Sequence, residues 1–314
     1  MNRSTMIGGK IKSRKKINWC QIAFILWATI IPLVHFSVLY IGVHFNSFFM
    51  AFQRVKVTGE ITWGLNNFRM FFSEFSKSTS MIRLSLRNTA LSWIVAQCTT
   101  ISGFLVSFFL YKKIFMNRFF RIVFFLPGLL AGTVVSSIFA NIVGVDGPIA
   151  KLVMEWGNLE YLPDLLHDSQ FANKTIFANT LVFGFANGMI IWGGALSRIP
   201  EDIIEAGKLD GLNWWREIIF ITIPLVWPTV ALNIIMALCG FFGASGSVFL
   251  LTRGNYQTMT LSCWMYLQVL DSGSDINALN YMSAVGLCIS VVAITISLIV
   301  RKLTDNSAFS KVQF

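Results

Sequence analysis

The sequence of 314 residues predicts an all-α polytopic membrane protein with six transmembrane helices. Two features of the composition predict this class: 55% of the residues are hydrophobic and only 13% are charged. Soluble domains carry about 25% charged residues. The third feature is that the apolar residues gather in runs of about 20, the length of a helix that crosses the hydrocarbon core of a bilayer.

Six apolar segments are long enough to cross the membrane as helices. They are Trp19–Tyr40, Asn88–Leu110, Phe119–Ile142, Ile176–Leu196, Ile218–Phe242 and Tyr281–Val300. The apolar stretch from the end of the first segment to Phe52 is expected to continue that helix or to lie at the membrane interface. It contains no small-residue cleavage site, so the first segment is interpreted as a retained span and not as a signal peptide.

Lys and Arg residues are unevenly distributed between the connections. They precede the first span (10–16), follow the second (112–121) and follow the sixth (301–311), whereas the connection between the third and fourth spans is mainly acidic. Because basic residues favour the cytoplasmic side, both termini and the loop after the fourth span are predicted to be cytoplasmic. The first external loop is also basic and does not follow this rule. The net charge of +10 is therefore assigned to span-flanking residues, and no nucleic-acid partner is expected.

A polar loop between the fourth and fifth spans is predicted to contain a short helix. Pro200 suits a first helical position, and Glu201 and Asp202 suit the N-terminal turn. Gly211 is a natural end. Four residues spaced three and four apart share one side of this helix: Ile203, Ala206, Gly207 and Asp210. Small residues on that side would let another protein approach closely, so the loop is predicted to dock a partner.

The same loop resembles a known motif. The run Glu205-Ala206-Gly207-x-x-Asp210-Gly211, followed by Ile221-x-Ile223-Pro224, resembles the EAA loop of the inner-membrane permeases of binding-protein-dependent ABC importers. Leu196-x-x-Ile199-Pro200 resembles the form found in the maltose and multiple-sugar branch of that family. Gly207 and Ile223 stand where the motif usually has Ala and Leu, and both exchanges are conservative. The resemblance continues more weakly from about Leu86 to Lys302.

The resemblance implies an ABC transmembrane type I fold in a bacterial plasma (inner) membrane. Its core would cover residues 86–302, with a cytoplasmic coupling loop at 197–217 that docks on an ATPase. A first transmembrane helix and an external segment (19–85) would precede the core, and cytoplasmic tails (1–18 and 303–314) would flank the whole. The residues implied in ATPase coupling are Glu205, Ala206, Gly207, Asp210 and Gly211.

The resemblance also implies the partners. A second homologous permease, two copies of a cytoplasmic ABC ATPase and an extracellular or periplasmic solute-binding protein would assemble with the chain. ATP and Mg²⁺ would be used by the ATPase, so no cofactor or metal is expected in this chain. Its function would be to form half of the path for a carbohydrate and to couple ATPase motion to alternating access.

Chemistry that is missing from the sequence excludes other classes. No Asp or Glu lies within the six predicted spans, which disfavours proton or sodium relays. Walker A, Gly-x-Ser-x-Gly, His-Glu-x-x-His and Cys-x-x-Cys patterns are also absent, so an enzyme is not expected. The alternatives are an ion-coupled secondary transporter or channel, a membrane scaffold that transports nothing, and an importer of a non-sugar small solute.

Neutral polar residues inside the predicted spans have two interpretations. Hydrogen bonding between helices is the favoured one. The other is a path for a neutral, hydroxyl-rich solute, with aromatic rings as stacking surfaces. The candidate path residues are Gln97, Asn179, Asn187, Trp192, Asn233 and Trp264. Close helix packing is expected at Gly128-x-x-x-Gly132 and at Gly184-x-x-x-Gly188.

Overall fold

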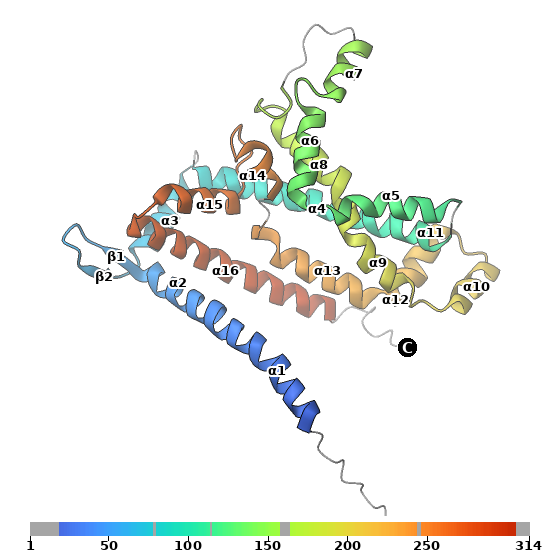
Figure 1. Cartoon of the computed structure of the whole chain (residues 1–314), viewed down its shortest axis with the longest axis horizontal. Coiled ribbons are helices and arrows are strands. Elements are labelled where there is room, and N and C mark those ends of the chain that lie inside the picture. Colours follow the sequence, from blue (N-terminus) through green and yellow to red (C-terminus); the bar gives the residue numbers. More distant parts are fainter. Residues whose placement is uncertain (1–18, 78–79, 114, 158–163, 244–245, 306–314) are drawn as a thin grey trace, which may run out of the picture. The chain divides into compact units, whose positions relative to one another are not determined.

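The computed structural model describes residues 19–77, 80–113, 115–157, 164–243 and 246–305 (Figure 1). The predicted N-terminal tail, 1–18, lies outside these ranges. So does the predicted C-terminal tail, 303–314, from residue 306 onward. Within them the chain is almost entirely helical, which confirms the predicted class. The elements are α1 (Trp19–His35), the π-helix η1 (Phe36–Gly42), α2 (Val43–Phe52), β1 (Gln53–Val55), β2 (Ile61–Trp63), α3 (Asn66–Ser76), α4 (Met81–Tyr111), α5 (Asn117–Leu129), α6 (Gly132–Val143), α7 (Pro148–Gly157), α8 (Ala172–Gly184), the 3₁₀ helix η2 (Phe185–Gly188), α9 (Met189–Leu196), α10 (Glu201–Leu209), α11 (Trp214–Glu217), the π-helix η3 (Ile218–Thr222), α12 (Ile223–Leu225), α13 (Trp227–Cys239), the 3₁₀ helix η4 (Phe241–Gly243), α14 (Gly246–Thr252), α15 (Leu261–Ser272) and α16 (Ile276–Asp305).

The chain divides into two compact units, residues 1–49 and 50–314. The described part of the first unit is one helical run through α1, η1 and most of α2. The apolar stretch Phe24–Phe52 is long enough to cross a membrane, so the prediction that the first helix continues to Phe52 is confirmed.

Five described helical segments are long and apolar enough to be spans, and a bent pair of helices adds a sixth if it is counted as one. Besides the first, these are Met81–Tyr111, Gly132–Gly157, Ala172–Leu196, Ile276–Asp305 and the pair Trp214–Leu225 and Trp227–Cys239. The structure therefore agrees with the six predicted spans in number. It differs in the course of two of them.

The predicted third span, Phe119–Ile142, is wrong as a single helix. The chain forms α5, becomes extended at Leu130 and Ala131, and starts again as α6. Pro127 lies in the last turn of α5, where it removes the backbone bond to the carbonyl of residue 123 and weakens the end of the helix. The apolar segment that qualifies as a span here begins at Gly132 and continues to Gly157.

The predicted fifth span, Ile218–Phe242, is also wrong as a straight helix. Its two halves meet at an angle of 79°. Pro224 and Pro228 flank the bend at Val226, where each removes a donor from the helical hydrogen bonds. The bend separates the short helices next to the polar loop from the apolar α13.

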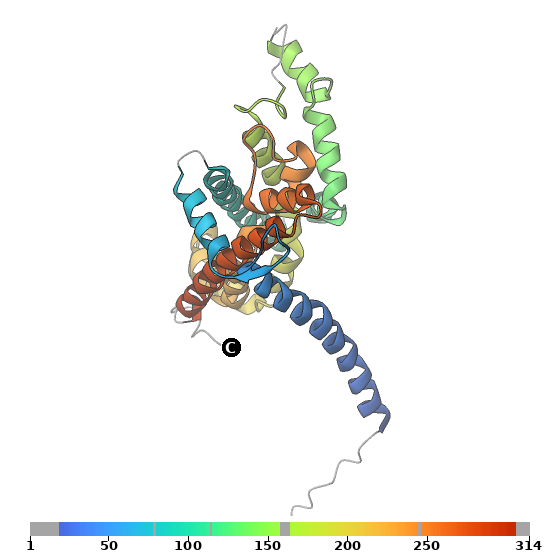
Figure 2. The same cartoon turned by 90° about the vertical axis from the view of Figure 1, so that its left-hand side faces the viewer.

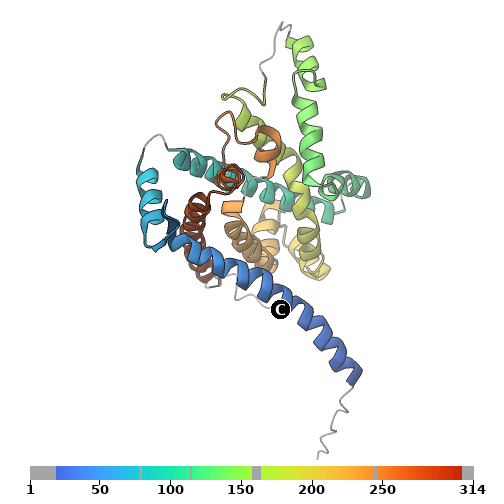
Figure 3. The ribbon, with the colours of Figure 1, turned by 60° about the vertical axis from the view of Figure 1, so that its left-hand side comes forward.

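Helix α4 is central to the second unit and crosses α8, η2 and α9 at close range (Figures 2 and 3). A Cβ atom added to Gly103 would lie 2.8 Å from the carbonyl oxygen of Phe185, and one added to Gly184 would lie 3.1 Å from Thr99. The expected close packing is thus confirmed for Gly184. A Cβ atom added to Gly128 would likewise lie 3.2 Å from the carbonyl oxygen of Ala186, whereas one added to Gly132 would have nothing within 4 Å.

The segment between the first two spans, which the sequence predicts to be external, is partly helical, and it also forms a two-stranded antiparallel hairpin of β1 and β2. The hairpin is held to α16 by Asn277, whose side chain bonds both the N–H and the C=O of Val55. The hydroxyl of Tyr281 donates to Glu74 of α3 at 2.6 Å. These contacts attach the segment to one end of α16.

The Gly103 contact gives a prediction for stability. Gly103→Ala places a methyl group against backbone that cannot swing away, and overpacking of this kind costs about 1–3 kcal/mol. The thermal unfolding midpoint of the purified protein should fall. Gly193→Ala in α9 is the control, because no atom lies within 4 Å of its added Cβ. Equal midpoints for the two variants would contradict the close crossing of α4 and η2.

Candidate functional site

The polar loop after the fourth span folds as α10, a nine-residue helix. Glu201 and Asp202 occupy its first turn and Lys208 its last, which matches the charges favoured at each end of a helix. Pro200 takes the N-cap and not the first helical position. Gly211 has a φ of +72°, and the N–H of Leu212 donates to the carbonyl of Gly207 at 3.0 Å. The predicted short helix with a glycine end is therefore confirmed.

Four of the five predicted coupling residues are exposed: Glu205, Ala206, Asp210 and Gly211. Gly207 is buried instead, with Ile221 Cδ1 only 2.9 Å and Leu212 Cδ1 3.1 Å from the position of an added Cβ. The structure thus places Gly207 against its own chain and not on the face predicted for a partner. Its small size lets α10 lie close to η3.

The exposed surface of α10 also carries an apolar residue that the sequence analysis missed. Leu209 is 90% exposed, between the charged residues Lys208 and Asp210. An apolar side chain this exposed at a helix end is available for contact with another surface. Leu209 could have been predicted as part of this surface, because it lies next to the motif residue Asp210.

The C-terminal end of α4 contacts the polar loop at three points, and α10 lies at the same end of the unit (Figure 1). The Tyr111 hydroxyl donates to the carbonyl of Ile199 at 3.3 Å. Lys113 lies 3.7 Å from a carboxylate oxygen of Glu201, and both side chains are about three-quarters exposed. Lys112 forms an ion pair with Glu217 that is much less exposed.

The sequence analysis also missed this Lys112–Glu217 ion pair. Glu217 is only 4% exposed and lies in α11, one residue before the predicted fifth span. Lys112 lies two residues after the end of the predicted second span. The sequence did offer a signal for this pair. The two residues carry opposite charges and lie at ends of spans that are predicted to be on the same side of the membrane.

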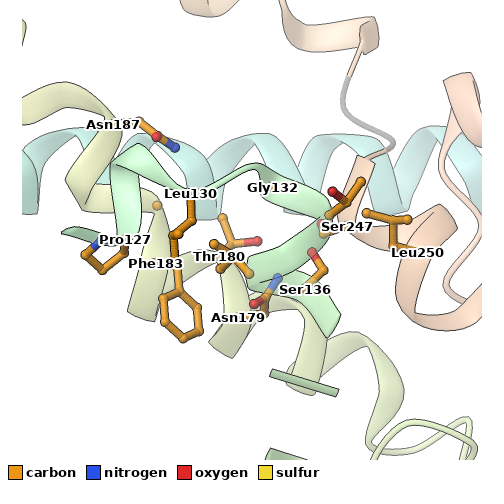
Figure 4. Close-up of a pocket in the computed structure, with 13 residues that line it drawn as sticks. Pro127, Leu130, Gly132, Ser136, Asn179, Thr180, Phe183, Asn187, Ser247 and Leu250 are labelled. Carbon is orange, nitrogen blue, oxygen red and sulfur yellow. The ribbon is translucent and has the colours of Figure 1, made fainter. Parts of the chain in front are cut away.

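Two cavities receive most of the candidate path residues. The α6–α8 cavity has a volume of about 470 Å³ and is lined by both helices, η2 and α14. Asn179 and Asn187 line it together with Ser136, Thr180 and Ser247. Figure 4 shows Asn179 and Ser136 on one side of the cavity and Asn187 at the opposite end. Asn179 is 5% exposed, and its Oδ1 atom has no hydrogen-bond partner among the described residues.

The α4–α13 cavity is smaller, with a volume of about 330 Å³. Three further candidate path residues line it: Gln97, Trp192 and Asn233. The Trp192 ring packs edge to face on Phe104 at 5.2 Å, and its indole nitrogen is buried without a partner in the described structure. The structure therefore divides the predicted path residues between two separate cavities.

The candidate Trp264 is placed differently from the prediction. It belongs to α15 and not to an external loop, and it is buried in a cluster with Ile82, Leu261 and Tyr281. It lines neither cavity and is only 7% exposed, so the structure gives no support to a sugar-stacking role for it.

Several polar residues in the spans bond within their own helix, contrary to the favoured interpretation. Thr99 and Thr100 donate to the carbonyl of Ala96, and Asn233 donates to the carbonyl of Thr229. These bonds do not join helices. Asn233 also lines the α4–α13 cavity.

The loop Arg253–Thr260 connects α14 to α15, and it is called the outer loop because the sequence predicts it to be external. Three of its non-glycine residues have positive φ: Arg253 (51°), Tyr256 (54°) and Gln257 (60°). Such backbone is strained for residues with a Cβ, so neighbouring contacts must hold it. On the α8 side, Asn173 donates to the carbonyl of Gln257 at 3.1 Å, and the His167 ring packs on Tyr256 at 5.3 Å.

His167 is itself fixed by Asp164. Burial alone would raise the pKa of the Asp164 carboxyl, but hydrogen bonds from the backbone N–H groups of Leu166 and His167 and from the His167 ring outweigh it. The pKa of Asp164 is therefore held below its usual range, and the carboxylate stays charged at neutral pH. No cluster of three or more His, Cys, Asp or Glu residues suited to a metal occurs in the described ranges.

Comparison with known proteins identifies the family. Residues 91–309 match the family of binding-protein-dependent transport system inner membrane components, and the chain belongs to it. The permease protein MsmF of the multiple sugar-binding transport system of Streptococcus mutans is 27% identical over 77% of this chain and 81% of its own length. The chain is thus a multi-pass transport permease of a binding-protein-dependent importer and not an enzyme.

Solved structures agree on the fold. A chain of a bacterial ABC transporter that imports the acidic polysaccharide alginate superposes with a TM-score of 0.75, at 16% identity over 92% of this chain and 97% of that chain. A second structure, of the alginate transporter in complex with an alginate pentasaccharide-bound periplasmic protein, gives a TM-score of 0.71 at 17% identity, over 92% and 98%. The ABC importer permease fold is therefore established.

Proposed function

We propose that this chain is one of two permease subunits in an ATP-driven carbohydrate importer and that α10 couples it to the ATPase. The observation that carries the proposal is the exposed, charged helix α10 between two membrane spans. Glu205, Leu209 and Asp210 all lie on its accessible surface. Leu209 lies beside Asp210 and one turn after Glu205, so this surface fits a cleft with an apolar floor and basic groups opposite the two carboxylates.

The side of the membrane follows from the neighbours of α10. The connection after α4 carries Lys112, Lys113, Arg118 and Arg121, and basic residues of this kind favour the cytoplasm. Lys113 reaches Glu201 at the start of α10, so both loops lie at the same end of α4. A cytoplasmic α10 is the orientation that a cytoplasmic ATPase requires, and the termini fall on that side as well.

The remaining partners follow from the family. A second, homologous permease completes the path, two copies of the ATPase bind ATP and Mg²⁺, and a solute-binding protein delivers the ligand from outside. When the ATPase dimer closes on ATP, it displaces α10. The helices that α10 joins, α9 before it and α11 to α13 after it, then move as rigid bodies. Access to the cavities changes from one side of the membrane to the other.

The α6–α8 cavity is the proposed carbohydrate subsite. Its lining offers amide and hydroxyl groups and no charged side chain, which suits a neutral solute rich in hydroxyls. The unpaired Oδ1 atom of the buried Asn179 is an acceptor without a donor, and a sugar hydroxyl would supply one. The similarity to a multiple-sugar permease and to alginate importers supports a carbohydrate over another small solute.

An ion-coupled carrier is not favoured. Such carriers place ionisable side chains along the path to bind the coupling ion. No Asp, Glu, Lys or Arg lines either the α6–α8 or the α4–α13 cavity.

A charge reversal tests the coupling role of α10. Glu205→Lys should abolish uptake and substrate-stimulated ATP hydrolysis, because it places a cation where a basic cleft is expected, while membrane insertion stays normal because Glu205 is exposed. Uptake, ATP hydrolysis and the amount of protein in the membrane are the measurements. Glu60→Lys, at an exposed position in the hairpin turn, is the matched control. Normal ATP-dependent uptake by Glu205→Lys would exclude the docking role.

A pair of matched substitutions tests the substrate site. Asn187→Leu removes a polar group from the exposed lining of the α6–α8 cavity, so folding should be unaffected. The KM for uptake should rise about tenfold, since a sugar would lose hydrogen bonds worth about 1–1.5 kcal/mol. The transported sugar would first be identified with the wild-type complex from a panel of saccharides.

The control is Asn233→Leu in the α4–α13 cavity, for which a change below about twofold is expected. If Asn233→Leu raised the KM and Asn187→Leu did not, the subsite would belong to the other cavity.

A further inference from the structure

Helix α4 connects the two ends of the second unit. It is a continuous helix of 31 residues, which at 1.5 Å per residue extends about 45 Å. Its C-terminal end meets the α10 loop, and residues near its N-terminal end meet the outer loop Arg253–Thr260. A displacement at one end can therefore reach the other through a single rigid element.

At the C-terminal end of α4, the ion pair between Lys112 and Glu217 is more buried than the other ion pair there, and its geometry is therefore more strictly fixed. The Glu217 side chain is 5% exposed and that of Lys112 is 24% exposed, whereas Lys113 and Glu201 are 78% and 76% exposed. The attraction in exposed ion pairs is screened by water, so they contribute little to stability. A buried pair fixes its geometry, because separating the charges would leave a carboxylate unpaired away from water.

Glu217 also marks the start of the moving part. It ends α11, directly before the π-helix η3 and the bend that leads to α13. Lys112 bonds the Oε2 atom of this carboxylate, whereas the Oε1 atom is buried without a partner among the described residues. Lys112 is held in turn over the ring of Phe108, one turn earlier on α4.

At the other end, two buried residues of α4 hold the outer loop. Asn88 donates to the carbonyl oxygens of Gln257 at 2.7 Å and of Met259 at 3.0 Å. Thr89 accepts a bond from the N–H of Leu261 at 2.9 Å. Because the loop carries strained backbone at three positions, its shape depends on such bonds. The loop leads from α14, which lines the α6–α8 cavity.

Between its ends α4 crosses η2 with little space. Gly103 lies against the backbone of Phe185, and Thr99 lies against Gly184. Close backbone contact at mid-length lets the helix tilt about this crossing more easily than it can shift sideways. Apolar contacts along the rest of α4 can slide, whereas a buried ion pair cannot slide without breaking.

We propose that the Lys112–Glu217 ion pair makes α4 move with the α10 loop, and that α4 transmits this motion to the outer loop and to the α14 wall of the α6–α8 cavity. The inference rests on the proposed coupling function. Lys112 and Glu217 act as positioning residues, since neither lines the α6–α8 cavity, although Lys112 shares a small surface pocket with Glu205 and Lys208 of α10.

Two double variants separate this role from a structural one. Lys112→Met with Glu217→Met removes both charges, which leaves no unpaired buried charge and is often tolerated for stability. Lys112→Glu with Glu217→Lys exchanges the charges and keeps the attraction. Lys113→Met is the control, because it removes the exposed ion pair at the same helix end.

The readout is the outer loop. In a chain whose native cysteines are replaced, Asn255→Cys provides an exposed reporter. Its rate of modification by a polar maleimide is measured in the complex with the copurifying ATPase, with and without a slowly hydrolysed ATP analogue. We expect the nucleotide to change the rate at least fivefold in the parent chain, in the charge-exchanged variant and in Lys113→Met. In the Met–Met variant the change should fall below about twofold while the ATPase remains bound.

The outcomes distinguish the two proposals. If the Met–Met variant keeps the full nucleotide-dependent change, the ion pair does not transmit motion, and this inference alone is overturned. If the charge-exchanged variant behaves like the Met–Met variant, attraction between the two positions is not what matters, and the inference is again overturned. If no ATPase copurifies with the parent chain, the proposed function fails and the inference fails with it.

Discussion

The attachment of α10 to the end of α4 is the contact on which the arrangement of the second unit depends. Tyr111 and Lys113 of the α4 end reach the segment that begins α10, and the adjacent Lys112 reaches Glu217 at the segment that follows it. The polar loop is therefore supported at both of its ends by one helix. Between these two ends, Gly207 lets α10 lie close to η3. A loop held in this way is a rigid extension of the transmembrane helices and can pass on a force applied to its exposed face.

The sequence predicted those parts of the structure that depend on local chemistry. The charges at each end of α10, the glycine at its end and the long apolar runs are all local signals, and the structure contains the corresponding elements. The residues proposed for ATPase coupling were predicted from the same local signals, and four of the five are exposed. Gly207 was predicted on the partner face because helical spacing groups residues by side. Which side faces the protein depends on Ile221 and Leu212, whose positions follow from the tertiary fold.

The errors have a common physical origin. Hydropathy reports that a segment is apolar, but it does not report whether the helix is continuous, so the break after Pro127 and the bend near Pro224 were missed. The candidate path residues were chosen by type, and type does not say which cavity a residue lines. Trp264 is the clearest case, since an interior position and an exposed stacking surface both suit an indole. The Lys112–Glu217 pair joins residues 105 positions apart and needed the fold to become visible.

The most direct test of the central claim is a contact map of α10 in the assembled transporter. A photo-activated cross-linking amino acid in place of Leu209, which is 90% exposed, would report what covers the helix in membranes of living cells. We expect a cross-link to a cytoplasmic ATPase subunit. A cross-link to the external solute-binding protein, or none to any ATPase while the complex remains assembled, would contradict the claim that a nucleotide-driven subunit holds this loop.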